Sequence, residues 1–185
     1  MDIVAHGLWA GIGVTLAGRR WPIARRTAVA TVAMAVAPDL AQLLPLLGVA
    51  LFANGGFAAL TSYVTALPAF DPALPPTVAL LTHHLHCTLH SAVVAMAVTL
   101  LVWAATQSLW IPLLGWWSHI AIDVFTHSAR FYPVSVFYPF TEWGFDGWAW
   151  NTPWFLTLNY VALGLALLWL WQARAGAAGR AFEHR

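Results

Sequence analysis

The sequence predicts an all-α membrane protein, a polytopic bundle of about five helices. Hydrophobic residues make up 61% of the 185 residues and charged residues only 8%, and the apolar residues form several long stretches. A soluble domain has about a quarter of its residues charged. Because one spanning helix needs about 20 apolar residues, we expect a single membrane-embedded domain over residues 1–173. Residues 174–185 lack a periodic pattern and are predicted to form a mobile cytoplasmic tail.

The first two apolar stretches differ in character. Residues 3–18 are rich in glycine and follow Asp2, where a signal peptide would have basic residues, so we expect a retained helix. Residues 27–53 are interrupted by Pro38, Asp39, Gln42 and Pro45. Because a proline inside a helix removes a hydrogen-bond donor, this span is predicted to be kinked or discontinuous.

The remaining chain alternates between loops and apolar stretches. Residues 54–76 are rich in glycine and proline and predict an exposed loop with a surface helix. Residues 77–105 and 109–126 predict the third and fourth spans. Residues 127–152 are aromatic and rich in turn-forming residues, as is typical of a membrane interface. The last predicted span, residues 153–171, is uninterrupted.

The arginines predict the orientation in the membrane. Seven of the eight lie between the first two spans or after the last one, and the chain contains no lysine. By the positive-inside rule these two regions are cytoplasmic, so an odd number of spans places the N-terminus outside and the C-terminus in the cytoplasm. A net charge of +1 gives no basic field for nucleic acid, and we expect no such partner.

Ionisable residues from four predicted spans lie at a similar depth, in the outer half of the membrane. They are His6, Asp39, His83, His84, His86, His90, His119, Asp123 and His127. Ionisable groups in a membrane are costly and usually pair with one another or with a cofactor inside the bundle. The sequence therefore predicts a polar site there.

Helical spacing selects the strongest candidates from this set. His86 and His90 lie one turn apart, as do His119 and Asp123, so each pair can bind one ion from a rigid backbone. Imidazole and carboxylate together suit a divalent metal, most readily zinc, with manganese or iron as alternatives. We predict a metal site at these two pairs.

The other candidates also have structural readings. His6 lies at a helix end and could bond to the backbone or to a lipid headgroup, and Asp39 could cap a helix that restarts at the kink. His83, His84 and His127 could support the ligands from outside or lie at the interface.

Four motifs resemble the YdjM-like family of inner-membrane, metal-dependent hydrolases. They are His6, the pair Pro38-Asp39, the pair His90-Ser91, and GWWSHIAIDVFTHSARFYPVSVFYPF from Gly115 to Phe140. That family in turn resembles the zinc-dependent phospholipase C and nuclease group, all-helical enzymes that cleave phosphoesters at a zinc cluster. The resemblance implies a multi-pass protein of the cell inner (cytoplasmic) membrane.

The resemblance also implies roles for individual residues. It implies metal ligation by His6, Asp39, His90, His119 and Asp123, with Asp39 also the candidate general base for the attacking water. The family's histidine segment usually contains His-Arg and then Thr-His-Ser, whereas this chain has HHLHCTLHS. His83, His84 and His86 are therefore alternatives for the upstream ligand, and the spacing to His90 favours His86.

The function expected from these features is that of a membrane-bound, metal-dependent hydrolase. Its substrate would be a phosphoester or a lipid-like molecule at the outer membrane face, where the partners are membrane lipids. Two other classes are compatible with the same residues: a metal or proton transporter, and a b-type haem protein with two histidine ligands. The cytoplasmic half has few polar residues for a transport path.

Overall fold

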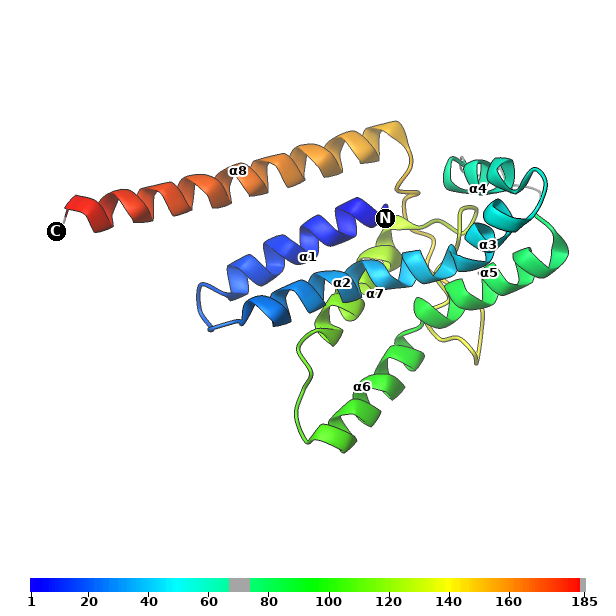
Figure 1. The fold of residues 1–185 in the computed structure, drawn as a ribbon, viewed down its shortest axis with the longest axis horizontal. Helices are drawn as coiled ribbons and strands as arrows, with labels where there is room; N and C mark the ends of the chain where they lie inside the picture. Colours follow the sequence, from blue (N-terminus) through cyan, green and yellow to red (C-terminus); the bar gives the residue numbers. More distant parts are fainter. Residues whose placement is uncertain (67–73, 184–185) are drawn as a thin grey trace.

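The protein is all-helical over the part that the computed structural model describes, residues 1–66 and 74–183. Eight helices and no strand occur in these residues (Figure 1). The helices are α1 (Ile3–Ala17), α2 (Arg25–Gln42), α3 (Leu44–Phe52), α4 (Gly56–Val64), α5 (Pro76–Leu89), α6 (Ala92–Thr106), α7 (Leu113–Thr126) and α8 (Pro153–Glu183). The predicted helical class is therefore confirmed.

Helix α2 lies at the centre of the arrangement. It packs against α1 and α7 and also contacts α5, whereas α8 packs along α1 (Figure 1). The contact with α7 is very close at Gly115, where an added Cβ atom would lie 2.0 Å from the carbonyl oxygen of Thr31. Only glycine permits this approach of two helix backbones, and it brings α7 next to the polar end of α2.

The second predicted span is divided, as its prolines indicate. Helices α2 and α3 meet at Leu43 with a bend of 53°. The break follows Gln42 rather than Pro38, which lies inside α2. Pro45 lies in the first turn of α3, where a missing N–H leaves no helical bond unmade.

The third predicted span is not continuous, contrary to the expectation of one helix over residues 77–105. Helices α5 and α6 are bent by 60° at His90 and Ser91. The Ser91 hydroxyl oxygen accepts hydrogen bonds from the backbone N–H groups of Val93 and Val94, at 3.1 and 3.2 Å, and so begins α6. The Trp116 indole N–H donates to the Leu89 carbonyl, 2.6 Å away, at the end of α5.

One helix is long and apolar enough to span a membrane. It is the Pro153–Ala175 part of α8, whose 23 residues are about 34 Å long. The two bent pairs, α2 with α3 and α5 with α6, pass the same test only if each pair counts as one span. Helix α1 has 15 residues and α7 has 14, each shorter than the hydrocarbon layer of about 30 Å. The predicted fourth span, residues 109–126, is thus shortened because α7 begins at Leu113.

Helix α8 also extends beyond the predicted last span, because it continues to Glu183. Its outer surface is strongly apolar, with Leu158, Val161 and Leu165 all more than half exposed. Its inner surface packs Leu163 and Leu170 against Ala5 and Ile12 of α1. A helix with one packed face and exposed leucine and valine side chains suits contact with lipid.

We predict that Gly115→Ala destabilises the protein by about 1–3 kcal/mol, because the added methyl group must separate α7 from α2. Gly13→Ala is the matched control, since a Cβ atom there meets nothing within 4 Å. Thermal unfolding in detergent micelles measures both. Equal unfolding midpoints for Gly115→Ala and the unaltered protein would contradict the close α2–α7 contact.

Candidate metal centre

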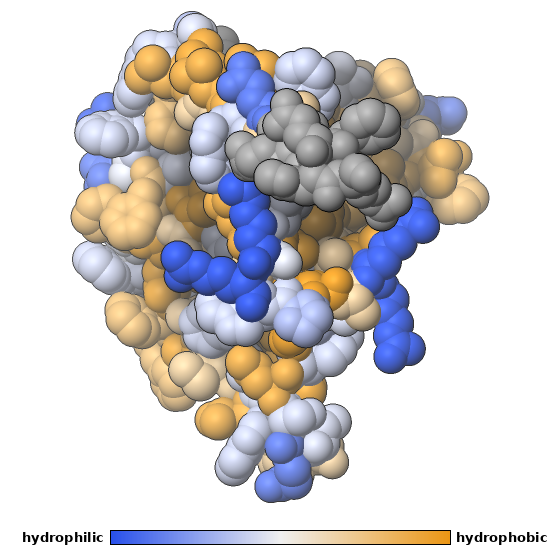
Figure 2. Space-filling view, turned by 90° about the vertical axis from the view of Figure 1, so that its left-hand side faces the viewer, coloured by the Kyte–Doolittle hydropathy of each residue, from blue (hydrophilic) through white to orange (hydrophobic). Residues whose placement is uncertain are grey.

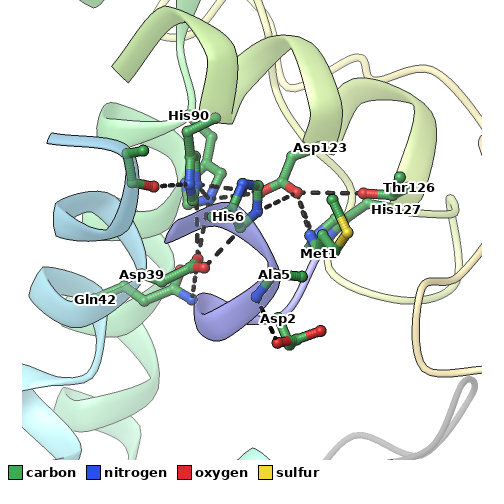
Figure 3. Close-up of polar contacts among 12 residues, drawn as sticks. Met1, Asp2, Ala5, His6, Asp39, Gln42, His90, Asp123, Thr126 and His127 are labelled. Atoms are coloured by element: carbon green, nitrogen blue, oxygen red, sulfur yellow. Dashed lines mark hydrogen bonds and ion pairs between the residues drawn. The ribbon is translucent and has the colours of Figure 1, made fainter. Parts of the chain in front are cut away.

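Six predicted site residues come together in the interior of the helical bundle, and Figure 3 labels five of them: His6, Asp39, His90, Asp123 and His127. His6 comes from α1, Asp39 from α2, His90 from the end of α5, His119 and Asp123 from α7, and His127 directly follows α7. None of the six is more than 6% exposed. Residues far apart in the sequence thus form one buried polar cluster.

Four of these residues form a compact ligand set. One ligand atom from each of Asp39, His90, His119 and Asp123 lies within 4.8 Å of the others. The Asp123 Oδ2 atom is 3.3 Å from Nε2 of His90 and 3.1 Å from Nε2 of His119. The Asp39 Oδ1 atom lies 3.5 and 3.7 Å from the same two nitrogens. The described residues therefore contain a buried Asp/His cluster that could hold a metal ion.

Backbone hydrogen bonds fix which imidazole nitrogen faces the centre. The Nδ1–H group of His90 donates to the His86 carbonyl at 2.9 Å, and that of His119 donates to the Ala35 carbonyl at 2.7 Å. A carbonyl oxygen only accepts, so Nδ1 carries the proton in both rings. Each neutral ring then presents the lone pair of Nε2 to the cluster, as metal-binding histidines do.

The arrangement fits a cation better than it fits an empty polar core. The Nε2 atoms of His90 and His119 are 2.9 Å apart, and when both rings are neutral with Nδ1 protonated, neither can donate to the other. Two carboxylates add further negative charge beside these lone pairs. Ligand atoms about 2.1 Å from a shared ion are about 3.0 Å apart at a right angle and about 3.4 Å apart at a tetrahedral angle. The separations that involve Nε2 of His90 or His119 are 2.9 to 3.7 Å, close to this range.

Asp123 has a second set of neighbours. Its Oδ1 atom lies 2.9 Å from His6 Nε2 and 3.6 Å from His127 Nε2. The His127 Nδ1–H group donates to the Tyr132 carbonyl at 2.7 Å, so its Nε2 lone pair also faces Asp123. The Met1 nitrogen contacts the same oxygen and lies 3.2 Å from His127 Nε2. The Asp123 carboxylate thus lies between two pairs of histidines. His90 and His119 are near its Oδ2 atom, and His6 and His127 are near its Oδ1 atom.

His86 lies beside the cluster rather than in the four-residue ligand set. Its Nδ1–H group donates to the side-chain oxygen of Gln42 at 2.8 Å, and the Gln42 amide donates to Asp39 Oδ1 at 3.4 Å. This chain of bonds holds the Asp39 carboxylate in place. The spacing that favours His86 and His90 assumes one continuous helix, whereas His90 ends α5 and its Nδ1–H bonds back to the His86 carbonyl.

His83 and His84 lie outside the cluster. His83 is 48% exposed and lies 3.5 Å from a carboxylate oxygen of Glu142. His84 is also exposed, and its Nδ1 atom lies 3.1 Å from the Tyr138 hydroxyl. Of the further candidates, the structure brings only His127 to the cluster.

Sequence reasoning misses several residues that position the ligands. The Ser91 hydroxyl caps the N-terminus of α6, and the Trp116 indole N–H bonds to the Leu89 carbonyl at the end of α5. Together these two contacts place His90 at the bend between the helices. A serine directly before an apolar stretch is a helix-start signal, so Ser91 could have been found. The carbonyl groups of Ala35 and Tyr132 act through the backbone and leave no such signal in the sequence.

A pocket of about 300 Å³ reaches the cluster from outside. Asp39, Gln42 and His127 line its polar end. The rest of its wall is mostly apolar and includes Ile3, Val4, Leu43, Val64, Phe131 and Trp150. Tyr63 and Tyr132 also line it, with ring centroids 5.0 Å apart. The Asp/His cluster is therefore approached through a mostly apolar opening.

Comparison of the chain with protein-family models, with curated proteins and with solved structures finds no significant match. The resemblance to the YdjM-like family stays a prediction. The site is defined by its own geometry, namely buried carboxylates and oriented imidazoles from several helices.

We predict that zinc raises the thermal unfolding midpoint of the metal-free protein, because an ion bound only by the folded state stabilises it by about 2.7 kcal/mol at 100 times its dissociation constant. His119→Ala is expected to abolish this shift and the bound metal. His84→Ala removes an exposed histidine outside the cluster and is expected to keep both. Metal analysis beside the unfolding curves tests this, and an unaltered protein that binds no divalent ion would refute the site.

Proposed function

We propose that the protein is a membrane-bound, metal-dependent hydrolase that cleaves a phosphoester or lipid-like substrate. The observation that carries the proposal is the meeting of two buried carboxylates with oriented imidazoles at the end of an apolar pocket. Hydrolytic sites need ligands that leave a coordination position for water and a route for substrate. The pocket beside Asp39 offers such a route.

The ligands and the base can be assigned to particular atoms. His90 and His119 would hold a divalent ion through Nε2, with Asp123 Oδ2 and Asp39 Oδ1 completing the set. Such an ion supplies a Lewis acid and lowers the pKa of water to about 7, which makes a nucleophile available at neutral pH. Asp39 Oδ2 has no hydrogen-bond partner in the described residues, and Asp39 lines the pocket. We assign it as the atom that accepts the proton of the attacking water.

A second set of possible ligands consists of His6, His127 and Asp123 Oδ1, and it shares only the Asp123 side chain with the first set. The Met1 nitrogen lies at this second set, in contact with Asp123 Oδ1 and 3.2 Å from His127 Nε2. A second ion would therefore have to displace the Met1 nitrogen. With two ions, the site would supply Lewis acids for both the attacking and the leaving oxygen of a phosphoester.

Pocket shape supports a substrate with an apolar part. Its walls are mostly apolar, whereas the buried Asp39 and His127 add polar groups to the lining. Burial and a hydrogen bond to Tyr132 raise the pKa of the Tyr63 phenol above its usual value, so a neutral phenol lines the pocket. A lipid has a phosphoester next to its apolar chains, so its phosphoester could lie beside Asp39 and His127 while its chains contact the apolar walls.

The geometry favours hydrolysis over the haem alternative. Axial ligands of a haem iron lie on opposite sides of the macrocycle. The Nε2 atoms of His90 and His119 face each other at 2.9 Å, which leaves no space for a ring between them. Nearby carboxylates serve a divalent ion and have no place in bis-histidine haem ligation.

We also propose the finer membrane arrangement, a multi-pass bundle of about five spans in the inner (cytoplasmic) membrane with the N-terminus outside. The turn between α1 and α2 carries Arg19 and Arg20, and Arg25 and Arg26 begin α2; this end of the two helices lies toward the same end of the molecule as the C-terminal part of α8 (Figure 1). Arginines at one end are consistent with one cytoplasmic face. The pocket then opens toward the outer face.

Hydrolytic activity is expected from the zinc- or manganese-loaded protein in detergent, with a short-chain glycerophospholipid as substrate and release of the phosphorylated headgroup or of phosphate as the measurement. Asp39→Asn is expected to lower kcat by about 10²-fold or more, because it removes the proposed proton acceptor. Glu142→Gln, a carboxylate change outside the cluster, serves as the control. Metal-loaded protein that hydrolyses no phosphoester would refute the function while leaving the metal site intact.

Orientation is tested by labelling single cysteines in a Cys87→Ser background. Phe140→Cys, at a position 81% exposed, is expected to react with a membrane-impermeant maleimide on intact cells. Arg20→Cys, in the turn between α1 and α2, is expected to react only after the membrane is permeabilised. The reverse pattern would contradict the proposed orientation.

A further inference from the structure

A second cavity lies at the opposite end of the molecule from α3 and α4. Its volume is about 760 Å³, and it is lined by parts of α1, α2 and α8 and by the turn between α1 and α2. Two arginines from separate segments, Arg19 and Arg174, line it together. We propose that this cavity binds the phosphate group of an anionic membrane lipid.

The arginines with described side chains at this end have no carboxylate partner: Arg19, Arg20, Arg25, Arg26 and Arg174 form no ion pair. Among the residues whose side chains are described, every ion pair involves a histidine or the Met1 nitrogen, and none involves an arginine. No acidic residue lines the cavity. Figure 2 shows several strongly hydrophilic side chains gathered on this end of the molecule, among hydrophobic ones. Uncompensated guanidinium groups around a hollow favour an anion.

Arg19 is held in position by an aromatic ring. Its guanidinium carbon lies 4.7 Å from the centroid of the Trp169 ring of α8. Stacking on an aromatic face leaves the N–H groups at the edge of the guanidinium free to bind a phosphate at two points. The contact also joins the turn after α1 to α8, so that Arg19 and Arg174 face one space.

The position along α8 explains why the ligand is a lipid. Arg174 follows Pro153 by 21 residues, or about 32 Å of helix. The hydrocarbon layer is about 30 Å thick, so when one end of α8 enters it, Arg174 emerges at the opposite headgroup level. Val14, Ile23 and Ala173 add apolar walls, which suit the glycerol and first methylene groups below a lipid phosphate.

Native mass spectrometry of the purified full chain tests the proposal, with phosphatidylglycerol as the anionic lipid, phosphatidylcholine as the zwitterionic comparison and inorganic phosphate as the free anion. We expect saturable binding of phosphatidylglycerol in preference to phosphatidylcholine. The double variant Arg19→Gln/Arg174→Gln is expected to bind it about 30-fold more weakly, because each arginine near an anionic headgroup contributes about a fivefold effect.

The control is Arg25→Gln/Arg26→Gln, which removes the same charge at the same end from residues that do not line the cavity. It is expected to change the affinity by less than about threefold. Equal weakening by both double variants would overturn the proposal, since it would indicate general attraction to the basic end. Inorganic phosphate that binds as tightly as the lipid would also overturn it. Metal content, measured on the same samples, is expected to be unchanged, so this result is independent of the hydrolase.

Discussion

Two carboxylates buried among apolar helices form the constraint on which this structure depends. Asp39 and Asp123 are 6% and 0% exposed, and a charged carboxylate without water or a positive partner is unfavourable by several kcal/mol. The unfavourable burial of these two carboxylates must be offset by groups that the fold places next to them. The Met1 nitrogen contacts Asp123, and imidazoles from α1, α5 and α7 surround the two carboxylates. A divalent cation between Asp39, His90, His119 and Asp123 would add positive charge at this point. The helices thus bring together a set of groups that could hold an ion.

Breaks and close contacts in the helical backbone position the ligand side chains. The bend between α5 and α6 places His90 at a helix end, where its ring can turn back to the His86 carbonyl and point Nε2 inward. Gly115 lets α7 approach α2 so closely that His119 bonds to the Ala35 carbonyl. Exposed irregular backbone cannot exist in lipid, so each break is satisfied locally, as Ser91 does for α6. The same helix contacts that hold the fold together thus also orient the histidine side chains of the cluster.

Composition and periodicity predicted the helical class, the positions of most helices and the residues of the cluster. His6, Asp39, His119 and Asp123 could be proposed because ionisable residues in apolar helices are rare, and the structure brings them together. The bend at His90 could not be predicted from hydrophobicity, because the apolar pattern continues across it. His86, which helical spacing favours as a ligand, lies beside the four-residue set and bonds to Gln42. The bonds that orient His90 and His119 go to backbone carbonyls, and they leave no pattern in a single sequence.

The position of α8 has a consequence for how the molecule tolerates different bilayers. Among the described helices, α8 packs along α1 and contributes no side chain to the metal cluster. A helix held along one line of contact can tilt to match a thicker or thinner hydrocarbon layer at small energetic cost. Such tilting leaves the contacts of α2 with α7 unchanged. The fold therefore mechanically separates adaptation to membrane thickness from the geometry of the buried ligands.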